Sequence, residues 1–179
     1  MGIYEKNIMI KGRHATRMKA LASKFDDNLT NGLFVRNLDV YLTAPIVGKI
    51  YGRKAEVDTT DGDTTTIHTE QMNREMDNLL SNFRLLTILE NKDVVDLDER
   101  ISNAFRYDRD DQKRQPIDES FEAYLLGGID VLYEKLVESS HSTEDYVKNL
   151  FDFYDDFRAQ YANKIDFEKI DELCAKVKQ

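Results

Sequence analysis

Residues 31–55 read NGLFVRNLDVYLTAPIVGKIYGRKA, and this stretch decides the fold that we expect. It is mostly apolar, yet it contains Pro45, Gly48 and Gly52. A helical segment that is apolar on nearly every side is usually buried on nearly every side. We therefore expect residues 31–55 to lie at the centre of the protein, with the other helices packed around them.

Pro45 suggests that this stretch holds two helices rather than one. Thr43 suits the cap of a new helix, and Pro45 would then fall in its first turn, where a missing N–H costs little. We predict helices at 33–42 and 43–54 that form a central hairpin. The pattern alone leaves two alternatives, because a proline in this position either breaks a helix or kinks it.

Apolar residues recur every three or four positions along most of the remaining chain, which predicts further helices. Residues 5–10 fit either a short strand or the start of the first helix. The sequence favours an all-α fold, a single-domain bundle of seven or eight helices that covers residues 1–179. Besides the hairpin, we expect helices at 13–25, 69–91, 97–107 and 117–137, a charged connector at 108–115, and two helices that open after Ser142 and Asp166.

Residues 57–66, VDTTDGDTTT, are the one low-complexity segment. Asp61-Gly62 between Thr-rich flanks suits a small β-hairpin, and a polar loop fits equally well. The carboxylates of Asp58, Asp61 and Asp63 do not follow the order of an EF-hand loop, so we expect no calcium site.

Gly127 and Gly128 stand in the middle of the predicted helix 117–137. Each costs roughly 1 kcal/mol relative to alanine inside a helix. Two such residues indicate a close crossing with another helix, because glycine lets two backbones approach. We expect the partner to be Gly48 or Gly52 in the central stretch.

The overall composition is typical of a globular protein rather than a disordered chain, with 41% hydrophobic and 33% charged residues among 179. The uncharged run at residues 40–48 is too short to span a membrane, and the N-terminus lacks an apolar region long enough for a signal peptide. The single cysteine, Cys174, excludes an internal disulfide. We therefore expect a cytoplasmic protein without membrane contact.

Charge divides the chain into a basic and an acidic region. Residues 1–56 contain ten Lys and Arg against five acidic residues, whereas residues 57–179 contain fifteen against twenty-nine. The basic N-terminal region (residues 1–56) and the acidic helical region (residues 67–179) either neutralise each other or form a bipolar surface for a partner.

The residue types that carry catalysis are scattered. His14, His68 and His141 show no paired metal spacing, and Cys174 falls on an apolar helix face, which is typical of a buried thiol. No glycine-rich segment fits a phosphate-binding loop. We expect no catalytic residue, metal or cofactor. The sequence favours a non-enzymatic protein without settling the question.

Basic residues gather in two segments of the N-terminal region. If both segments face the same way, they form a patch suited to nucleic-acid phosphates or to an acidic partner. The alternative is that they bind the protein's own acidic helices. The patch consists of Lys11, Arg13, His14, Arg17, Lys49, Arg53 and Lys54.

The helix after Ser142 is both acidic and aromatic. If its apolar stripe faces the core, Phe153 and Tyr154 fall outside the stripe, and exposed aromatics rimmed by charge are typical of protein interfaces. A wide buried stripe with a solvated acidic back is the alternative. The candidate contact residues are Asp152, Phe153, Tyr154, Asp155 and Asp156.

These features favour a helical interaction protein, a subunit or adaptor of a larger complex or a homo-oligomer. A protein partner or self-association is the expected mode of action. Two alternatives remain, both involving nucleic acid. The basic patch would contact phosphates directly, or the acidic helices would mimic nucleic acid and block a protein that binds it.

Overall fold

A computed structural model describes residues 6–30, 32–60, 62–106, 110–161 and residue 175. These residues are mostly helical with one two-stranded sheet, which confirms the all-α prediction in outline. A π-helical turn, Glu134–Glu138, continues the sixth helix. The strands are β1 (Ile8–Lys11) and β2 (Thr64–Ile67), and the helices are α1 (Gly12–Leu21), α2 (Asn37–Ile50), α3 (Thr69–Arg74), α4 (Met76–Leu89), α5 (Leu97–Phe105), α6 (Asp111–Tyr133) and α7 (Thr143–Tyr161).

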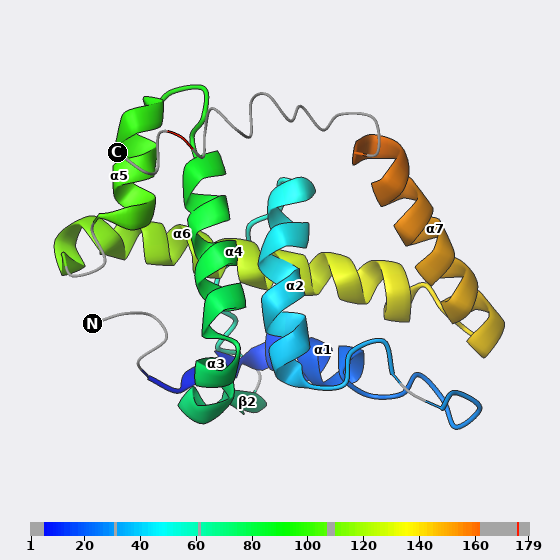
Figure 1. Cartoon of the computed structure of the whole chain (residues 1–179). Coiled ribbons are helices and arrows are strands. Elements are labelled where there is room, and N and C mark those ends of the chain that lie inside the picture. The colour runs from blue at the N-terminus through cyan, green and yellow to red at the C-terminus, as the bar shows by residue number, and fades with distance from the viewer. Residues whose placement is uncertain (1–5, 31, 61, 107–109, 162–174, 176–179) are drawn as a thin grey trace.

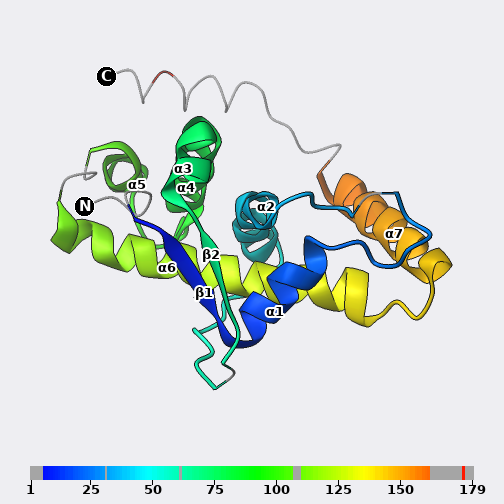
Figure 2. The same cartoon turned by 90° about the horizontal axis from the view of Figure 1, so that it is seen from below.

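Helix α6 spans the molecule from α5 at one end towards α7 at the other (Figure 1). It runs across α2 and α4 rather than alongside them, so the predicted bundle is not confirmed. Seen from below, α1 and the sheet cross the near side of α6 (Figure 2). The core therefore forms around α6, which buries Phe121, Leu125, Ile129 and Leu132.

The crossing of α2 and α6 is a contact between backbones. A Cβ atom added at Gly128 would collide with the carbonyl oxygen of Ala44, and one added at Gly48 would collide with that of Tyr124. Gly127 is equally close to the carbonyl of Arg53. The predicted glycine crossing is confirmed, with Gly48 as the partner.

The predicted central hairpin is wrong, because residues 37–50 form the single helix α2 with Pro45 inside it. The Thr43 hydroxyl caps no helix and instead donates to the carbonyl oxygen of Asp39, 2.9 Å away. Ala44, Pro45 and Val47 are buried. The burial of these side chains offsets the cost of about 3 kcal/mol that an internal proline imposes on a helix.

Of the two alternatives for residues 57–66, a β-hairpin or a polar loop, the hairpin is wrong. Strand β2 pairs antiparallel with β1, with Ile8 opposite Ile67 and Lys11 opposite Thr64. The pairing buries Ile10 and Ile67 on the core side of the sheet. Residues 57–60 carry only one apolar side chain, so they offer a strand no hydrophobic face of their own.

Further helix boundaries differ from the prediction, and one predicted helix is not tested. The helix expected at 69–91 is divided at Glu75, whose carboxylate binds Arg36 at 3.2 Å and Asn78 at 2.9 Å. Helix α6 begins before Pro116, because the Asp110 carboxylate accepts a hydrogen bond from the Lys113 N–H and caps it. The helix expected after Asp166 lies outside the described residues.

We expect Gly128→Ala to lower the free energy of unfolding by at least about 3 kcal/mol, because the new methyl group meets backbone that cannot rotate away. Helix propensity alone would change stability by about 1 kcal/mol in the opposite direction. Urea denaturation measures the difference. Gly62→Ala, which meets nothing within 4 Å, is the control and should change stability by less than about 0.5 kcal/mol. Equal effects of the two substitutions would contradict the close crossing.

Candidate functional site

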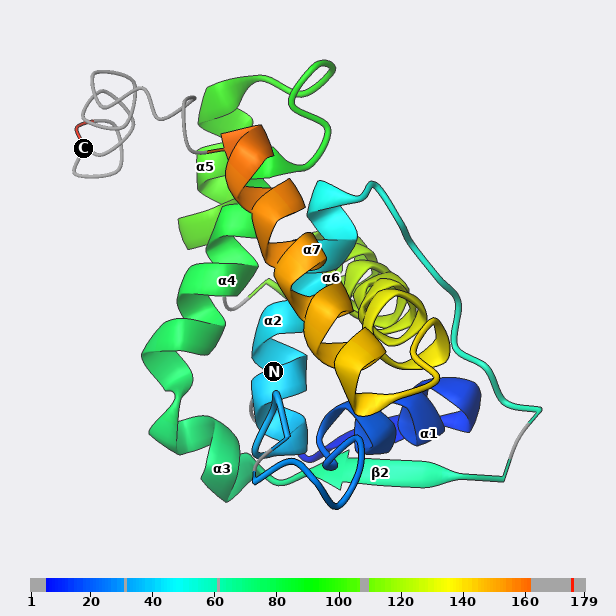
Figure 3. The same ribbon diagram turned by 90° about the vertical axis from the view of Figure 1, so that its right-hand side faces the viewer.

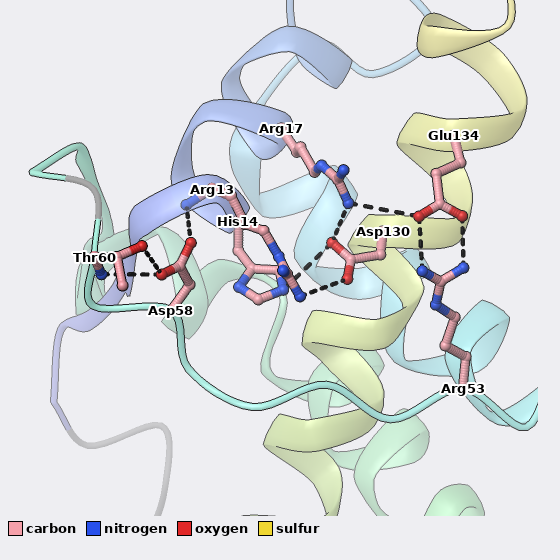
Figure 4. Close-up of polar contacts among 8 residues, drawn as sticks. All are labelled: Arg13, His14, Arg17, Arg53, Asp58, Thr60, Asp130 and Glu134. Atoms are coloured by element: carbon pink, nitrogen blue, oxygen red, sulfur yellow. Dashed lines mark hydrogen bonds and ion pairs between the residues drawn. The ribbon is translucent and has the colours of Figure 1, made fainter.

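The basic residues of α1 converge on one carboxylate of α6. Arg17 Nη1 lies 2.6 Å from Asp130 Oδ1, and Arg13 Nη2 lies 3.4 Å from Oδ2. Asp130 is only 1% exposed, whereas both arginines reach it from the protein surface (Figure 4). These two candidate contact residues are therefore ion-paired within the fold.

Arg53 joins the same side of α6 from the segment after α2. Its guanidinium donates two hydrogen bonds to the Glu134 carboxylate, at 2.5 and 2.7 Å, and Arg17 lies 3.7 Å from the same group. Figure 4 shows both basic segments directed towards Asp130 and Glu134. The two segments do converge, as the nucleic-acid hypothesis requires, but they converge on the protein's own acids.

His14 is the innermost member of this cluster and has no exposed surface. Its Nε2 lies 3.3 Å from Asp130 Oδ1, but neither ring nitrogen makes a hydrogen bond within the described part of the chain. A histidine beside a carboxylate resembles a catalytic pair. This one is closed to solvent, so no substrate reaches it in this conformation.

Burial alone would raise the pKa of Asp130. The contacts with His14 and Arg17 outweigh burial, so the pKa of Asp130 lies below its ordinary value. The carboxylate stays ionised at neutral pH, and its charge holds α1 against α6. This role is structural, because Asp130 presents almost no surface to a ligand.

Lys49 and Lys54 form a second cluster around Glu90. Their ammonium groups lie 2.5 and 2.8 Å from the Glu90 carboxylate, and both stand over the ring of Tyr124, 4.6 and 4.5 Å from its centroid. The Ser120 hydroxyl donates to the same carboxylate at 3.0 Å. Burial opposes ionisation, yet these partners lower the pKa of Glu90 to about 2.

A cleft of about 720 Å³ borders this second cluster, and helices α4, α5 and α6 contribute to its wall. Its lining mixes apolar side chains such as Ile117 and Phe121 with charged ones. One of these charges, Arg100, donates to the carbonyl oxygens of Val95 and Ile88 and so fastens α5 to α4. The cleft thus has volume for a small molecule, while Arg100, Glu90 and Lys54 in its lining already bind other parts of the fold.

The described ranges of the chain contain no grouping of side chains typical of a metal site and no membrane-spanning helix. No three His, Cys, Asp or Glu side chains in them are grouped closely enough to hold a metal ion. Asp58 and Asp63 serve α1 instead: Asp58 accepts from the backbone N–H of Arg13, and Asp63 accepts from the Thr16 hydroxyl. No helix among these residues is both long and apolar enough to cross a bilayer.

Helix α7 packs on the molecule with one aromatic face. The buried ring of Tyr146 stacks on Phe25, with centroids 4.7 Å apart. Phe153 stacks on Tyr51 at 6.2 Å and is half-buried. The expectation that Phe153 lies outside the apolar stripe is wrong, because it follows Tyr146 by two helical turns and shares its face.

Next to this packed face, α7 carries a second row of apolar side chains that the fold leaves in solvent. Phe151 is 64% exposed, Tyr154 60% and Val147 37%. Asp155 is exposed beside this row, and Asp152 and Asp156 are exposed further round the helix. Figure 3 shows α7 at the outside of the molecule, in the foreground of that view.

The sequence singled out Tyr154 on this face but missed Phe151 and Val147. The signal was present in the spacing, because Val147, Phe151 and Tyr154 follow one another at intervals of four and three residues. The same helix has a second stripe of that period on its inner face, so period alone does not tell which stripe is buried. The remaining member of the predicted basic patch, Lys11, is exposed at the end of β1.

We expect Asp130→Asn to lower the free energy of unfolding by about 3 kcal/mol, because Arg13 and Arg17 lose the buried carboxylate that neutralises their charge. Thermal and urea denaturation measure the loss. Glu122→Gln removes a carboxylate from an exposed position of the same helix and is the matched control. A loss no larger than that of Glu122→Gln would show that the arginines do not depend on Asp130.

The depressed pKa of Glu90 predicts a pH-dependent contribution to stability. The folded-state pKa lies below the ordinary value of 4.5, so the contribution is fully present above pH 4.5 and is lost as pH falls through about 2. We expect the free energy of unfolding of wild type to exceed that of Glu90→Gln by about 1–2 kcal/mol at pH 6 and by almost nothing at pH 2. Urea denaturation across this range measures the difference, and a difference independent of pH would contradict the assignment.

Comparisons with known proteins add no assignment to this geometry. No family model, curated protein or solved structure matches this chain. The candidate sites are therefore three: the cluster around Asp130, the cluster around Glu90 and the outer face of α7. Of these three, the outer face of α7 is the one whose side chains the described fold does not use.

Proposed function

We propose that this protein is a non-enzymatic helical interaction protein, a subunit or adaptor that binds a protein partner through the outer face of α7. The observation that carries the proposal is the exposure of Phe151, Tyr154 and Val147 in one row on that face. Large aromatic side chains are enriched at the centres of protein interfaces. Burial of each ring against a partner would contribute about 2 kcal/mol.

The charged side chains around this row support the same proposal. Asp155 flanks the aromatic row with an exposed carboxylate, and Asp152 and Asp156 are exposed further round the helix. An apolar centre with a polar rim is the usual anatomy of a protein interface, since the rim keeps the free protein in solution and adds selectivity.

Direct contact with nucleic acid is a weaker candidate. The convergence of Arg13, Arg17 and Arg53 on one side of α6 favours it. However, their carboxylate partners would have to be displaced or would repel the incoming phosphates. An acidic mimic of nucleic acid would use the carboxylates of α7, but it would not require aromatic side chains between them.

Photo-crosslinking tests the proposal. A benzophenone analogue of phenylalanine placed at position 151 or 154 should yield a covalent adduct with a partner protein or with a second copy. The same analogue at Glu122, exposed on α6, is the control and should yield none. Adducts from all three positions alike, or no adduct from positions 151 and 154, would contradict the proposed function.

A double substitution, Phe151→Ser with Tyr154→Ser, gives the complementary prediction. We expect it to abolish the adduct formed by an analogue placed at position 147, because the apolar centre is lost. The melting temperature should change little, since both side chains are exposed. Undiminished crosslinking by the variant would show that the contact does not depend on these aromatics.

A further inference from the structure

The outer face of α7 has the spacing of a two-stranded helical contact. Glu144, Val147, Phe151, Tyr154 and Arg158 follow at intervals of three, four, three and four residues, which is the spacing of the central positions of a coiled coil. All five side chains are exposed. We define this row as the α7 seam. A seam over two heptads is suited to receive one helix of another chain.

The charges at the two ends of the α7 seam are opposite. Glu144 lies seven residues before Phe151 and Arg158 lies seven residues after it, about 10 Å away in each direction. If a second α7 runs antiparallel with Phe151 on the two-fold axis, each Glu144 meets the Arg158 of the other copy. A parallel pair would place Glu144 against Glu144 and Arg158 against Arg158, which costs energy.

A second pair of charges agrees with the same arrangement. Lys148 and Asp155 flank the α7 seam on one side, three residues before Phe151 and four residues after it. In an antiparallel pair these flanking positions face each other, so Lys148 meets the Asp155 of the other copy. None of these four charged side chains forms an ion pair within the part of the chain that the structure describes.

We propose that the partner of the outer face of α7 is a second copy of this chain, paired antiparallel through the α7 seam. This inference rests on the proposed function, because it names the partner of the same surface. An isologous contact of this kind uses one patch twice and closes with two-fold symmetry. Phe151 packs against its symmetry mate at the centre, and the two ion pairs on each side fix the direction.

The size of the α7 seam sets the expected strength of the dimer. One helix face of four turns buries less than the roughly 800 Å² per partner of a standard interface. The dimer should therefore dissociate on dilution rather than persist at every concentration. The ion pairs lie at the rim in solvent, so high salt should weaken the dimer.

Sedimentation velocity on the full chain, from about 1 to about 200 µM, tests the inference through charge exchange. Wild type should pass from monomer to dimer over this range. Glu144→Arg and Arg158→Glu should each weaken the dimer at least about tenfold, because each turns two attractions into two repulsions. The double variant Glu144→Arg with Arg158→Glu should restore it. All three substitution sets lie on exposed positions, so melting temperatures should match wild type.

The outcomes separate this inference from the proposed function. A monomer at every concentration, a dimer that survives Phe151→Ser with Tyr154→Ser, or a double variant that is no better than the single ones would overturn antiparallel self-pairing. If the chain is monomeric and the crosslinker at position 151 still captures a different protein, self-pairing is wrong and the interaction function stands. If neither crosslinking nor a dimer is observed, both are wrong.

Discussion

The contact between Gly48 of α2 and Gly128 of α6 is the constraint on which the rest of the structure depends. Because these residues lack a Cβ, the two backbones meet directly, and α6 is held across α2 with little freedom to slide. The chain that leaves α2 then follows α6, and the Ala55 N–H donates to the Ala123 carbonyl at 2.9 Å. The positions of Arg53 beside Glu134 and of Asp130 beneath α1 both follow from this crossing.

The same crossing explains how the division of charge in the sequence is resolved. It brings the basic segments of the first 56 residues against carboxylates from the acidic region, so Asp130, Glu134 and Glu90 neutralise much of the predicted patch. Within the described part of the chain, helix α7 forms no ion pair with these basic segments. It remains acidic and apolar on its outer face, and for that reason it carries the functional proposals.

The sequence predicted two kinds of feature. One is a residue that destabilises its own helix unless a partner compensates it, and the other is a set of apolar residues that recur at helical spacing. Two glycines inside a helix had to be compensated by a close partner, and Gly48 was recognisable for that reason. Features set by distant packing could not be predicted. Nothing near Pro45 indicates that α6 will hold the helix through it, and nothing in residues 57–66 identifies β1 as the strand that pairs with β2. On α7, the two apolar stripes have the same period, and the positions of the distant rings of Phe25 and Tyr51 decide that Phe153 faces inward.

The long separations between contacting residues also govern when the protein can fold. Ala44 meets Gly128, Arg17 meets Asp130 and Arg53 meets Glu134, so the first half of the chain finds its partners only after α6 exists. During synthesis the ribosome makes α1, α2 and their arginines well before α6 emerges. Contacts of this range make folding slower than in a helical protein with neighbouring partners, because a long loop must close first. Until α6 is made, the nascent N-terminal half therefore leaves the apolar side chains of α2 uncovered, and exposed apolar surface favours aggregation.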